Sequence, residues 1–237
     1  MGQVYILQHV WGDPPGLFEQ LLRANQVPYR IVEVEVEPPP ANVDDMTALV
    51  VLGGLQYAGS DSDPLLNAEK ALMRDAIVRD IPVLGICLGG QLLASACGAP
   101  VIQGQATQIG FYENPLTESG LNDAVFQGID VQHLVFHWHN DGFYLPTGAV
   151  LLEQGSTEYC QSFRYGRRAY GVQYHPELTP DMLHDWISRH PQREQAVALL
   201  SEEGYQRIID DIPLRFPVHE AHARLLFNNF LKVSDLL

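Results

Sequence analysis

A cysteine flanked by glycines, between an apolar run and a helical pattern, is the residue of this chain best suited to act as a nucleophile. Cys87 follows the apolar residues 82–86 and lies in Gly85-Ile-Cys-Leu-Gly89. This is the cysteine form of the Gly-x-Ser-x-Gly nucleophile elbow, whose glycines permit a turn tight enough to expose the central side chain. Unpaired amides and the dipole of a following helix would favour the thiolate, which is the attacking species. The alternative is a buried, inert cysteine in a Gly-rich connection.

A histidine and a glutamate two residues apart could supply the base and acid that a cysteine nucleophile needs. The segment Ala-Tyr-Gly-Val-Gln-Tyr-His175-Pro-Glu177 has the pattern of a strand that ends at the imidazole. In extended chain, residues i and i+2 face the same side, and Pro176 biases His175 away from helical geometry. The order Cys87, His175, Glu177 therefore predicts a nucleophile, a general base and its supporting carboxylate. By itself, the pair could equally be a strand-end histidine beside a surface glutamate.

These two segments resemble the two signatures of class I (triad-type) glutamine amidotransferases. The segments are Gly-Ile-Cys-Leu-Gly-Gly-Gln and Tyr-Gly-Val-Gln-Tyr-His-Pro-Glu, and the resemblance extends from the first strand to about residue 190. The segments are similar to the amidotransferase part of GMP synthase and to free-standing proteins like it. In that family the cysteine attacks the side-chain amide of glutamine, the histidine protonates the departing ammonia, and water releases glutamate from a thioester. The resemblance assigns these roles to Cys87 and His175, with Glu177 in support.

The resemblance also implies an oxyanion hole and a glutamine pocket. The oxyanion donors would be the amides of Leu88 and of the Gly53-Gly54 turn, specifically Gly54, after the apolar run 48–52. Such a glycine pair lets main-chain N–H groups approach a substrate, although Gly-Gly also marks ordinary turns. The family often has proline where this chain has Leu55, which makes the loop less stiff. Gly53 and Gln91 would help to hold the substrate; the alternative for Gln91 is a helix-surface residue.

A histidine-rich segment, His133-Leu-Val-Phe-His137-Trp-His139-Asn140-Asp141, is the other candidate for chemistry. His137, His139 and Asp141 have side chains that suit zinc or iron, so a metal site is one hypothesis. The family resemblance implies instead that His139, Asn140 and Asp141 lie on the substrate side of the pocket, and that no metal or cofactor is needed. A pair of core histidines is a third possibility that the sequence leaves open.

The apolar patterning predicts an α/β fold: a flavodoxin-like class I amidotransferase fold with a mostly parallel central sheet, helices on both faces and an antiparallel extension. We expect one domain over residues 1–237, with a C-terminal helical extension from about 190 to 237. Asp63 is the expected cap of the second helix. The predicted strands are 4–10, 29–36, 48–52 and 82–86; the predicted helices are 16–25, 64–79, an elbow helix ending at Gly98, and 180–189, 193–210 and 218–233; the antiparallel extension would comprise 101–109, 131–137, 150–153, 158–164 and 169–174.

Charge and composition exclude several classes of function. The 237 residues carry a formal charge of −15, which argues against nucleic acid as a partner. The local basic group of Arg164, Arg167 and Arg168 is expected to be a solvated hairpin tip. Three cysteines without paired spacing indicate a reducing compartment. No signal peptide and no apolar run of about 20 residues is apparent, so we expect a cytoplasmic protein that does not contact membranes.

The sequence therefore predicts a cysteine-dependent amidohydrolase that converts glutamine to glutamate and ammonia. The chain contains no P-loop or other nucleotide-binding motif, so a synthase that receives the ammonia is expected to be a separate polypeptide. One alternative is a hydrolase of other γ-glutamyl conjugates, which needs no ammonia acceptor. Another is a non-catalytic regulatory or binding module with the same fold.

Overall fold

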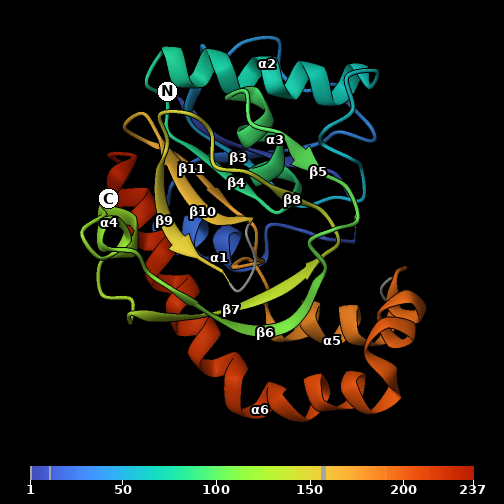
Figure 1. Ribbon diagram of the computed structural model, residues 1–237. Helices are drawn as coiled ribbons and strands as arrows, with labels where there is room; N and C mark the ends of the chain where they lie inside the picture. The colour runs from blue at the N-terminus through green and yellow to red at the C-terminus, as the bar shows by residue number, and fades with distance from the viewer. Residues whose placement is uncertain (1, 11, 156–158, 190) are drawn as a thin grey trace.

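A mostly parallel β-sheet forms the centre of the structure, which is a computed structural model that describes residues 2–10, 12–155, 159–189 and 191–237 (Figure 1). The seven strands have the order β2-β1-β3-β4-β11-β10-β9. The neighbours from β2 to β11 are parallel, whereas β10 is antiparallel to both β11 and β9. This confirms the predicted sheet with an antiparallel extension. The strands are β1 (Gln3–Gln8), β2 (Tyr29–Glu33), β3 (Met46–Val51), β4 (Val83–Ile86), β9 (Val150–Gln154), β10 (Cys160–Tyr165) and β11 (Ala169–Val172).

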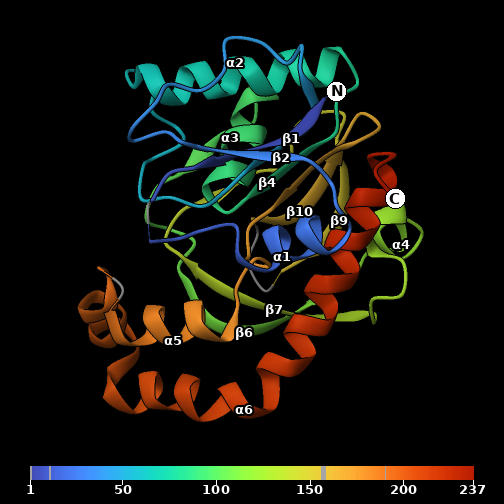
Figure 2. The ribbon, with the colours of Figure 1, turned by 180° about the vertical axis from the view of Figure 1, so that it is seen from behind.

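Helices cover both faces of this sheet because its central strands are apolar on both sides. In β1, Val4 and Ile6 join one core cluster while Tyr5 and Leu7 join the other, as the two-residue alternation of a strand requires. The first cluster packs against α1 (Gly16–Ala24) and the end of α6 (Arg193–Val233); the second packs against α2 (Pro64–Val78) and α3 (Leu88–Ala96). Figure 2 shows α2 and α3 on the side of the sheet opposite α1.

The predicted extension differs from the structure in two places. The run 101–109 is not one strand: β5 (Val101–Ile102) pairs with β8 (Gly142–Phe143), and β6 (Gln108–Pro115) pairs with β7 (Gln132–His139). Gly104 has φ +68° between them, a conformation that interrupts a strand. The run 169–174 forms β11, which lies inside the parallel part of the sheet beside β4. Residue 158 of the predicted strand 158–164 lies outside the described residues. Short helical turns occur at α4 (Glu118–Leu121) and η1 (Ala124–Phe126).

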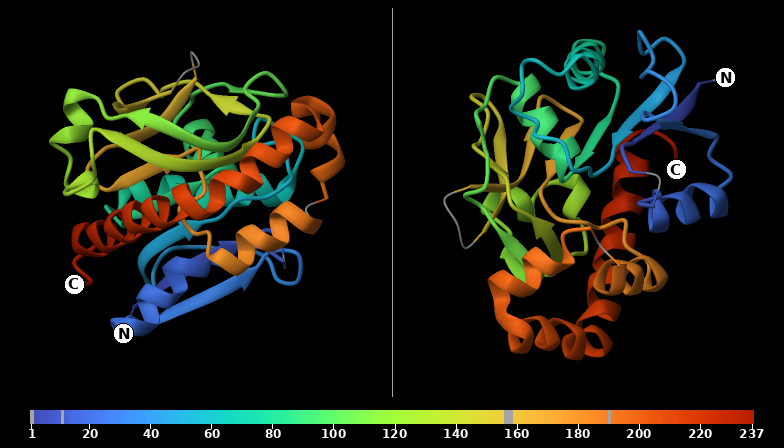
Figure 3. Two further views of the ribbon diagram at one scale, coloured as in Figure 1. Left: turned by 90° about the horizontal axis from the view of Figure 1, so that it is seen from below. Right: turned by 90° about the vertical axis from the view of Figure 1, so that its right-hand side faces the viewer.

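The C-terminal helices confirm one predicted boundary and correct another. Helix α5 (Pro180–Arg189) has the predicted ends, but the predicted break at 211–217 is wrong because α6 continues through Pro213 and Pro217. The non-helical residue is Ser201, with φ 66°. Proline bends a helix without ending it when packing holds both sides, and here Phe216 and Phe227 belong to different core clusters. Figure 3 shows the red segment of α6 running back toward the end of the molecule that carries the N-terminus.

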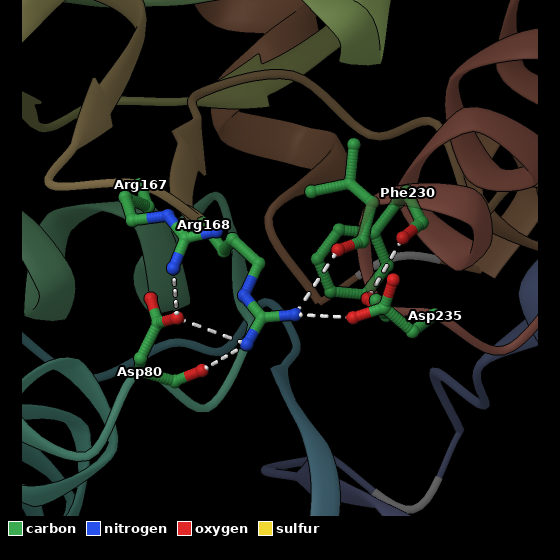
Figure 4. A network of polar contacts seen from close by, with 7 residues as sticks. Asp80, Arg167, Arg168, Phe230 and Asp235 are labelled. Carbon is green, nitrogen blue, oxygen red and sulfur yellow. Dashed lines mark hydrogen bonds and ion pairs between the residues drawn. The ribbon is translucent and has the colours of Figure 1, made fainter.

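The basic turn between β10 and β11 is a structural junction at Arg168, so the expectation of a solvated hairpin tip is wrong for this residue. Its guanidinium donates to the Asp80 backbone oxygen at 2.7 Å and pairs with the carboxylates of Asp80 and Asp235 at 3.0 and 2.8 Å (Figure 4). Arg167, which is more exposed, also pairs with Asp80. Arg168 thus connects the loop after α2 with the C-terminal end of the chain.

None of the helices in the described part of the chain combines the length and apolar character that a membrane crossing requires.

The N-terminus of α2 provides a test of how local sequence stabilises the fold. Asp63 accepts hydrogen bonds from the amides of Leu65 and Leu66, at 2.9 and 3.3 Å, as a helix cap does. We expect Asp63→Ala to lower the free energy of unfolding by about 1 kcal/mol in chemical denaturation. Asp61→Ala is the matched control, because that side chain is fully exposed and its ion pair with Lys70 is long, at 3.9 Å. Equal effects of the two substitutions would contradict the capping role.

Candidate active site

Cys87 occupies a strained turn between β4 and α3. Its φ of 51° and ψ of −107° lie in a region that non-glycine residues seldom adopt. The turn is forced by close packing: a methyl group on Gly89 would overlap the carbonyl oxygen of Val51, and one on Gly85 would overlap that of Gly89. The Gly89 amide donates to the carbonyl of Leu52 at 3.2 Å. The elbow turn therefore forms at Cys87, the residue before α3, but the expected exposure of its side chain is wrong: Cys87 is buried and reaches only the cavity described below.

His175 and Glu177 form the expected pair. The Nδ1 atom of His175 lies 2.7 Å from Oε1 of Glu177, and because the carboxylate can only accept, Nδ1 carries the hydrogen. Both side chains are buried. Their segment is anchored from two sides: the His175 amide donates to the Phe136 carbonyl of β7, and the Leu17 amide of α1 donates to the Glu177 carbonyl. The second nitrogen of His175, Nε2, makes no regular hydrogen bond within the described chain and is available for proton transfer.

The surrounding charges make the His175 imidazole a stronger proton acceptor than an ordinary histidine. Burial by itself would lower the pKa of this imidazole, but the Glu177 carboxylate and the Cys87 sulfur outweigh it and raise the pKa of His175 well above its ordinary value. A proton released by the thiol therefore has an acceptor close by. An imidazole oriented by a carboxylate and adjacent to a thiol can act first as base and then as acid.

A glutamine that the sequence reasoning missed links Cys87 to the pocket. The side-chain amide of Gln173 points at the Cys87 sulfur, 3.7 Å away, and its oxygen accepts from Gln91 at 3.3 Å. Gln91 also donates to the Asp141 carbonyl at 3.4 Å. Gln91 is buried, so it is not a helix-surface residue. Gln173 could have been found from the sequence, because the predicted strand 169–174 puts it two residues before His175, on the same side of an extended chain.

These side chains border a cavity of about 300 Å³. Its walls include Cys87, His175 and Glu177, together with the predicted pocket residues Gly53, Gly54, Gln91, His139, Asn140 and Asp141. Leu88 is not among the lining residues; only its amide, at the start of α3, is a candidate contact. The sequence reasoning missed other lining residues, namely Asp13, Leu55, Gln56, Tyr57, Gln103, Gly104, Trp138, Trp186 and Gln192.

Trp186 brings the C-terminal helices into the site. Its ring lies edge-on to the His175 imidazole, with centroids 4.7 Å apart. Its indole N–H donates to Asp13 at 2.8 Å. Burial raises the pKa of Asp13, and the hydrogen bond from Trp186 partly offsets the effect. No local pattern could have revealed this contact, because the two residues are 173 positions apart.

The histidine-rich strand β7 supplies one wall of the cavity in a neutral state. His139 Nδ1 donates to the Asp141 carbonyl at 2.9 Å, so its other nitrogen accepts from His137 Nδ1, also at 2.9 Å. Burial lowers the pKa of His139 to about 3. The Asp141 carboxylate accepts from the Gly104 amide. Both His139 nitrogens are therefore occupied, and no group of three potential metal ligands exists among the described residues, so the metal hypothesis has no support here.

Comparison with known proteins places this geometry in a family context. The model of the glutamine amidotransferase class-I family matches residues 17–188. The chain is 36% identical over 166 residues to the glutamine amidotransferase-like protein YfeJ of Salmonella typhimurium, covering 68% of this chain and 69% of that one. It is 29% identical to one subunit of the glutamine-hydrolysing GMP synthase of Archaeoglobus fulgidus, covering 74% and 89%. It spans only 24% of the length of the Candida glabrata GMP synthase, to which it is 36% identical.

Solved structures agree with the fold. The glutamine amidotransferase of Methylobacillus flagellatus superposes with a TM-score of 0.87 at 27% identity, covering 98% of this chain and 95% of that one. A glutamine amidotransferase of Thermotoga maritima superposes with a TM-score of 0.84 at 24% identity, covering 99% and 98%. Both similarities extend through the C-terminal helices, beyond the 17–188 segment of the family model.

The three cysteines should differ sharply in reactivity. Burial raises the pKa of Cys97 to about 11, and it raises that of Cys160 further. At pH 7.5 about one Cys97 in a thousand or fewer would be thiolate. We expect iodoacetamide to modify Cys87 first, as measured by peptide mass mapping over time. Labelling in guanidinium chloride, where all three thiols are exposed, is the control. Native labelling of Cys97 as fast as that of Cys87 would contradict the assignment of the nucleophile.

Proposed function

The chain belongs to the class I glutamine amidotransferase family, and from this premise we propose that it hydrolyses the side-chain amide of glutamine to glutamate and ammonia through a thioester on Cys87. Members of this family act as cysteine-dependent amidotransferases. The observation that carries the proposal is the convergence of Cys87, His175 and Glu177 on one cavity, with Nε2 of His175 unoccupied.

In the proposed acylation step, the Cys87 sulfur attacks the amide carbon of glutamine while His175 takes the thiol proton. The carbon–nitrogen bond then breaks, and the His175 proton moves from Nε2 to the leaving nitrogen, which departs as ammonia. In the second step a water molecule, deprotonated by His175, attacks the thioester; glutamate leaves and the thiol is restored. Glu177 keeps the imidazole oriented through Nδ1 and balances its positive charge.

We assign the oxyanion hole to the amides of Gly54 and Leu88. Leu88 is the first residue of α3, where amides have no partner within the helix. In the described chain, no backbone hydrogen bond from either amide is found outside regular helices and strands. A Cβ atom on Gly54 would lie too close to the side chains of Leu88 and His9, so glycine is the residue that fits at this position. Two such donors would stabilise the negative charge that develops on the amide oxygen.

The substrate would lie against Gly53, Gln91 and the β7 wall. Gln91 and His139 are held by their own hydrogen bonds, so they can contact a ligand without reorganising. Asn140 and Asp141 line the same wall, and Asp13 faces the cavity as well. These carboxylates suit the ammonium group of an amino acid.

A second candidate is a hydrolase of larger γ-glutamyl amides. The described lining of the cavity includes Asp13 and Asp141 but no lysine or arginine. Such a lining would accept a conjugate whose amine part carries a positive charge. Comparing glutamine with γ-glutamyl amides of neutral and of cationic amines separates the two functions. A non-catalytic module would show neither ammonia release nor glutamate release with any of them.

We propose a separate synthase as the recipient of the ammonia that this hydrolysis would release. The support is the similarity to one subunit of an archaeal GMP synthase, which by its name is one part of a larger assembly. The alternative hydrolase would work alone. Adding a candidate synthase should therefore raise glutamine hydrolysis if this chain is its ammonia-supplying component.

Kinetics of triad variants test the proposed reaction. We expect Cys87→Ala to abolish release of glutamate and ammonia, and His175→Ala to lower kcat by several orders of magnitude. Glu177→Gln should cost less, because its carboxylate orients the imidazole and does not transfer the proton. Cys97→Ala is the matched control and should retain activity. Turnover that survives in Cys87→Ala would end the thioester hypothesis.

The β7 wall should act on binding more than on chemistry. We expect His139→Ala to raise KM for glutamine about tenfold while kcat stays within about threefold, because the variant loses ring contact with the substrate and the hydrogen bond that holds the Asp141 backbone. His184→Ala on the exposed side of α5 is the control. A His139→Ala variant that loses kcat with KM unchanged would instead make this histidine part of the reacting group.

A further inference from the structure

A buried histidine–glutamate pair lies against the Gly53-Gly54 turn and takes no part in the mechanism described so far. His9 follows β1, and Glu69 lies on α2. His9 Nε2 is 2.9 Å from a Glu69 carboxylate oxygen, and His9 Nδ1 is 3.2 Å from the carbonyl oxygen of Gly53. Both side chains are 0% exposed, and neither lines the cavity. The pair therefore cannot contact a substrate, but it contacts the turn that would.

The hydrogen-bond partners determine where the protons must be. The Gly53 carbonyl oxygen can only accept, so His9 Nδ1 must carry a hydrogen to bond it. The other His9 nitrogen faces a carboxylate, so a second proton must lie between Nε2 and Glu69. Glu69 holds the ring from the Nε2 side, and this contact keeps Nδ1 directed at the Gly53 carbonyl. Without Glu69 the ring would lose the contact that fixes its orientation.

The geometry of the peptide bond transmits this contact to the active site. The C=O of Gly53 and the N–H of Gly54 belong to one peptide, and in a trans peptide these two groups point in opposite directions. No cis peptide occurs in the described chain. With the carbonyl held toward buried His9, the Gly54 N–H must point the other way, toward the cavity side, where Gly53 approaches His175 and Cys87.

The turn needs such a restraint because its own residues restrict the backbone very little. Two successive glycines leave the peptide plane free to rotate, and Leu55 follows where a proline would stiffen the chain. The next residue of α2 anchors the far end of the same loop: Lys70 donates to the carbonyls of Ala58 and Ser60, at 3.3 and 3.1 Å. Two adjacent residues of α2 thus act on both ends of the loop 53–60.

We propose that His9 and Glu69 are positioning residues that orient the Gly53–Gly54 peptide so that the Gly54 amide points at the developing oxyanion. The proposal rests on the proposed amide hydrolysis at Cys87. It adds a requirement outside the triad: the correct peptide orientation depends on a buried pair contributed by the end of β1 and by α2, which the substrate never touches.

Two variants of His9 separate orientation from simple loss of packing. His9→Leu removes the donor with little change in volume, whereas His9→Asn keeps an N–H near the position of Nδ1. We expect His9→Leu to lower kcat about a hundredfold, comparable to losing an oxyanion donor, with KM within about threefold. His9→Asn should recover at least tenfold of that loss. Glu69→Leu should resemble His9→Leu, and Glu69→Gln, which can still hydrogen-bond Nε2, should lose less.

The decisive readout is a reaction of Cys87 that forms no oxyanion. Alkylation by iodoacetamide displaces iodide at a saturated carbon, so its rate reports the thiol and His175 without the oxyanion hole. We expect this rate to be unchanged in His9→Leu, and thermal unfolding should show that the variant is folded. A parallel loss of alkylation and kcat, or an unchanged kcat, would overturn the positioning role.

Crystal structures of the wild type and of His9→Leu provide a test that is independent of activity. We expect the Gly53–Gly54 peptide to be rotated or to occupy two orientations in the variant, and to keep one orientation in His9→Asn. A single, wild-type peptide orientation in His9→Leu would overturn the inference. If the wild type shows no amide hydrolysis at all, the proposed function fails, and the peptide orientation in these structures still decides whether His9 controls the turn.

Discussion

The close approach of α3 to the strands beneath it is the constraint on which the site depends. Gly89 and Gly90 lie against the backbone of Val51 and Val172, and neither position has room for a methyl group. Because the helix begins so close to β3 and β11, the chain must turn abruptly at Cys87 and adopt a positive φ there. The same approach brings the end of β3, with its glycine turn, and the end of β11, with its histidine, to the first turn of α3. Parallel strands make this possible, since their carboxyl ends meet at one edge.

Burial lowers the pKa of several histidines around the site, but His175 is shifted in the opposite direction. His137, His139 and His219 have lowered pKa values because burial disfavours their charged forms. For His175 the Glu177 carboxylate and the Cys87 sulfur reverse the effect of burial and raise the pKa. A carboxylate 2.7 Å away thus distinguishes His175, which is suited to proton transfer, from His139, which lines the cavity with a lowered pKa. Because its pKa is low, His139 adds no positive charge beside the thiol that would compete with His175.

The C-terminal helices are part of the site and do more than complete the core. Trp186 packs its edge on the His175 ring and holds Asp13 by a hydrogen bond, which joins the loop after β1 to α5. Helix α6 returns beneath the sheet and buries Phe227 and Phe230 against α1, so the position of α1 also depends on it. Since the Leu17 amide of α1 donates to the Glu177 carbonyl, α6 also helps to hold the segment 175–177 in place through its contact with α1.

The sequence alone determined the elbow and the alternation of strands and helices, and it indicated the proposed triad, because each depends on local spacing: glycines around Cys87, the i, i+2 relation of His175 and Glu177, and apolar runs of strand length. It failed where the outcome depended on packing. The two prolines of α6 did not end the helix, and the run 101–109 was divided between two partners. Only the tertiary structure decided which distant residues meet at the site. His9 and Glu69 are 60 positions apart, Gln91 and Gln173 are 82, and Asp13 and Trp186 are 173. No local pattern encodes such contacts, because they arise from the order of strands in the sheet and from the faces that the helices bury against it.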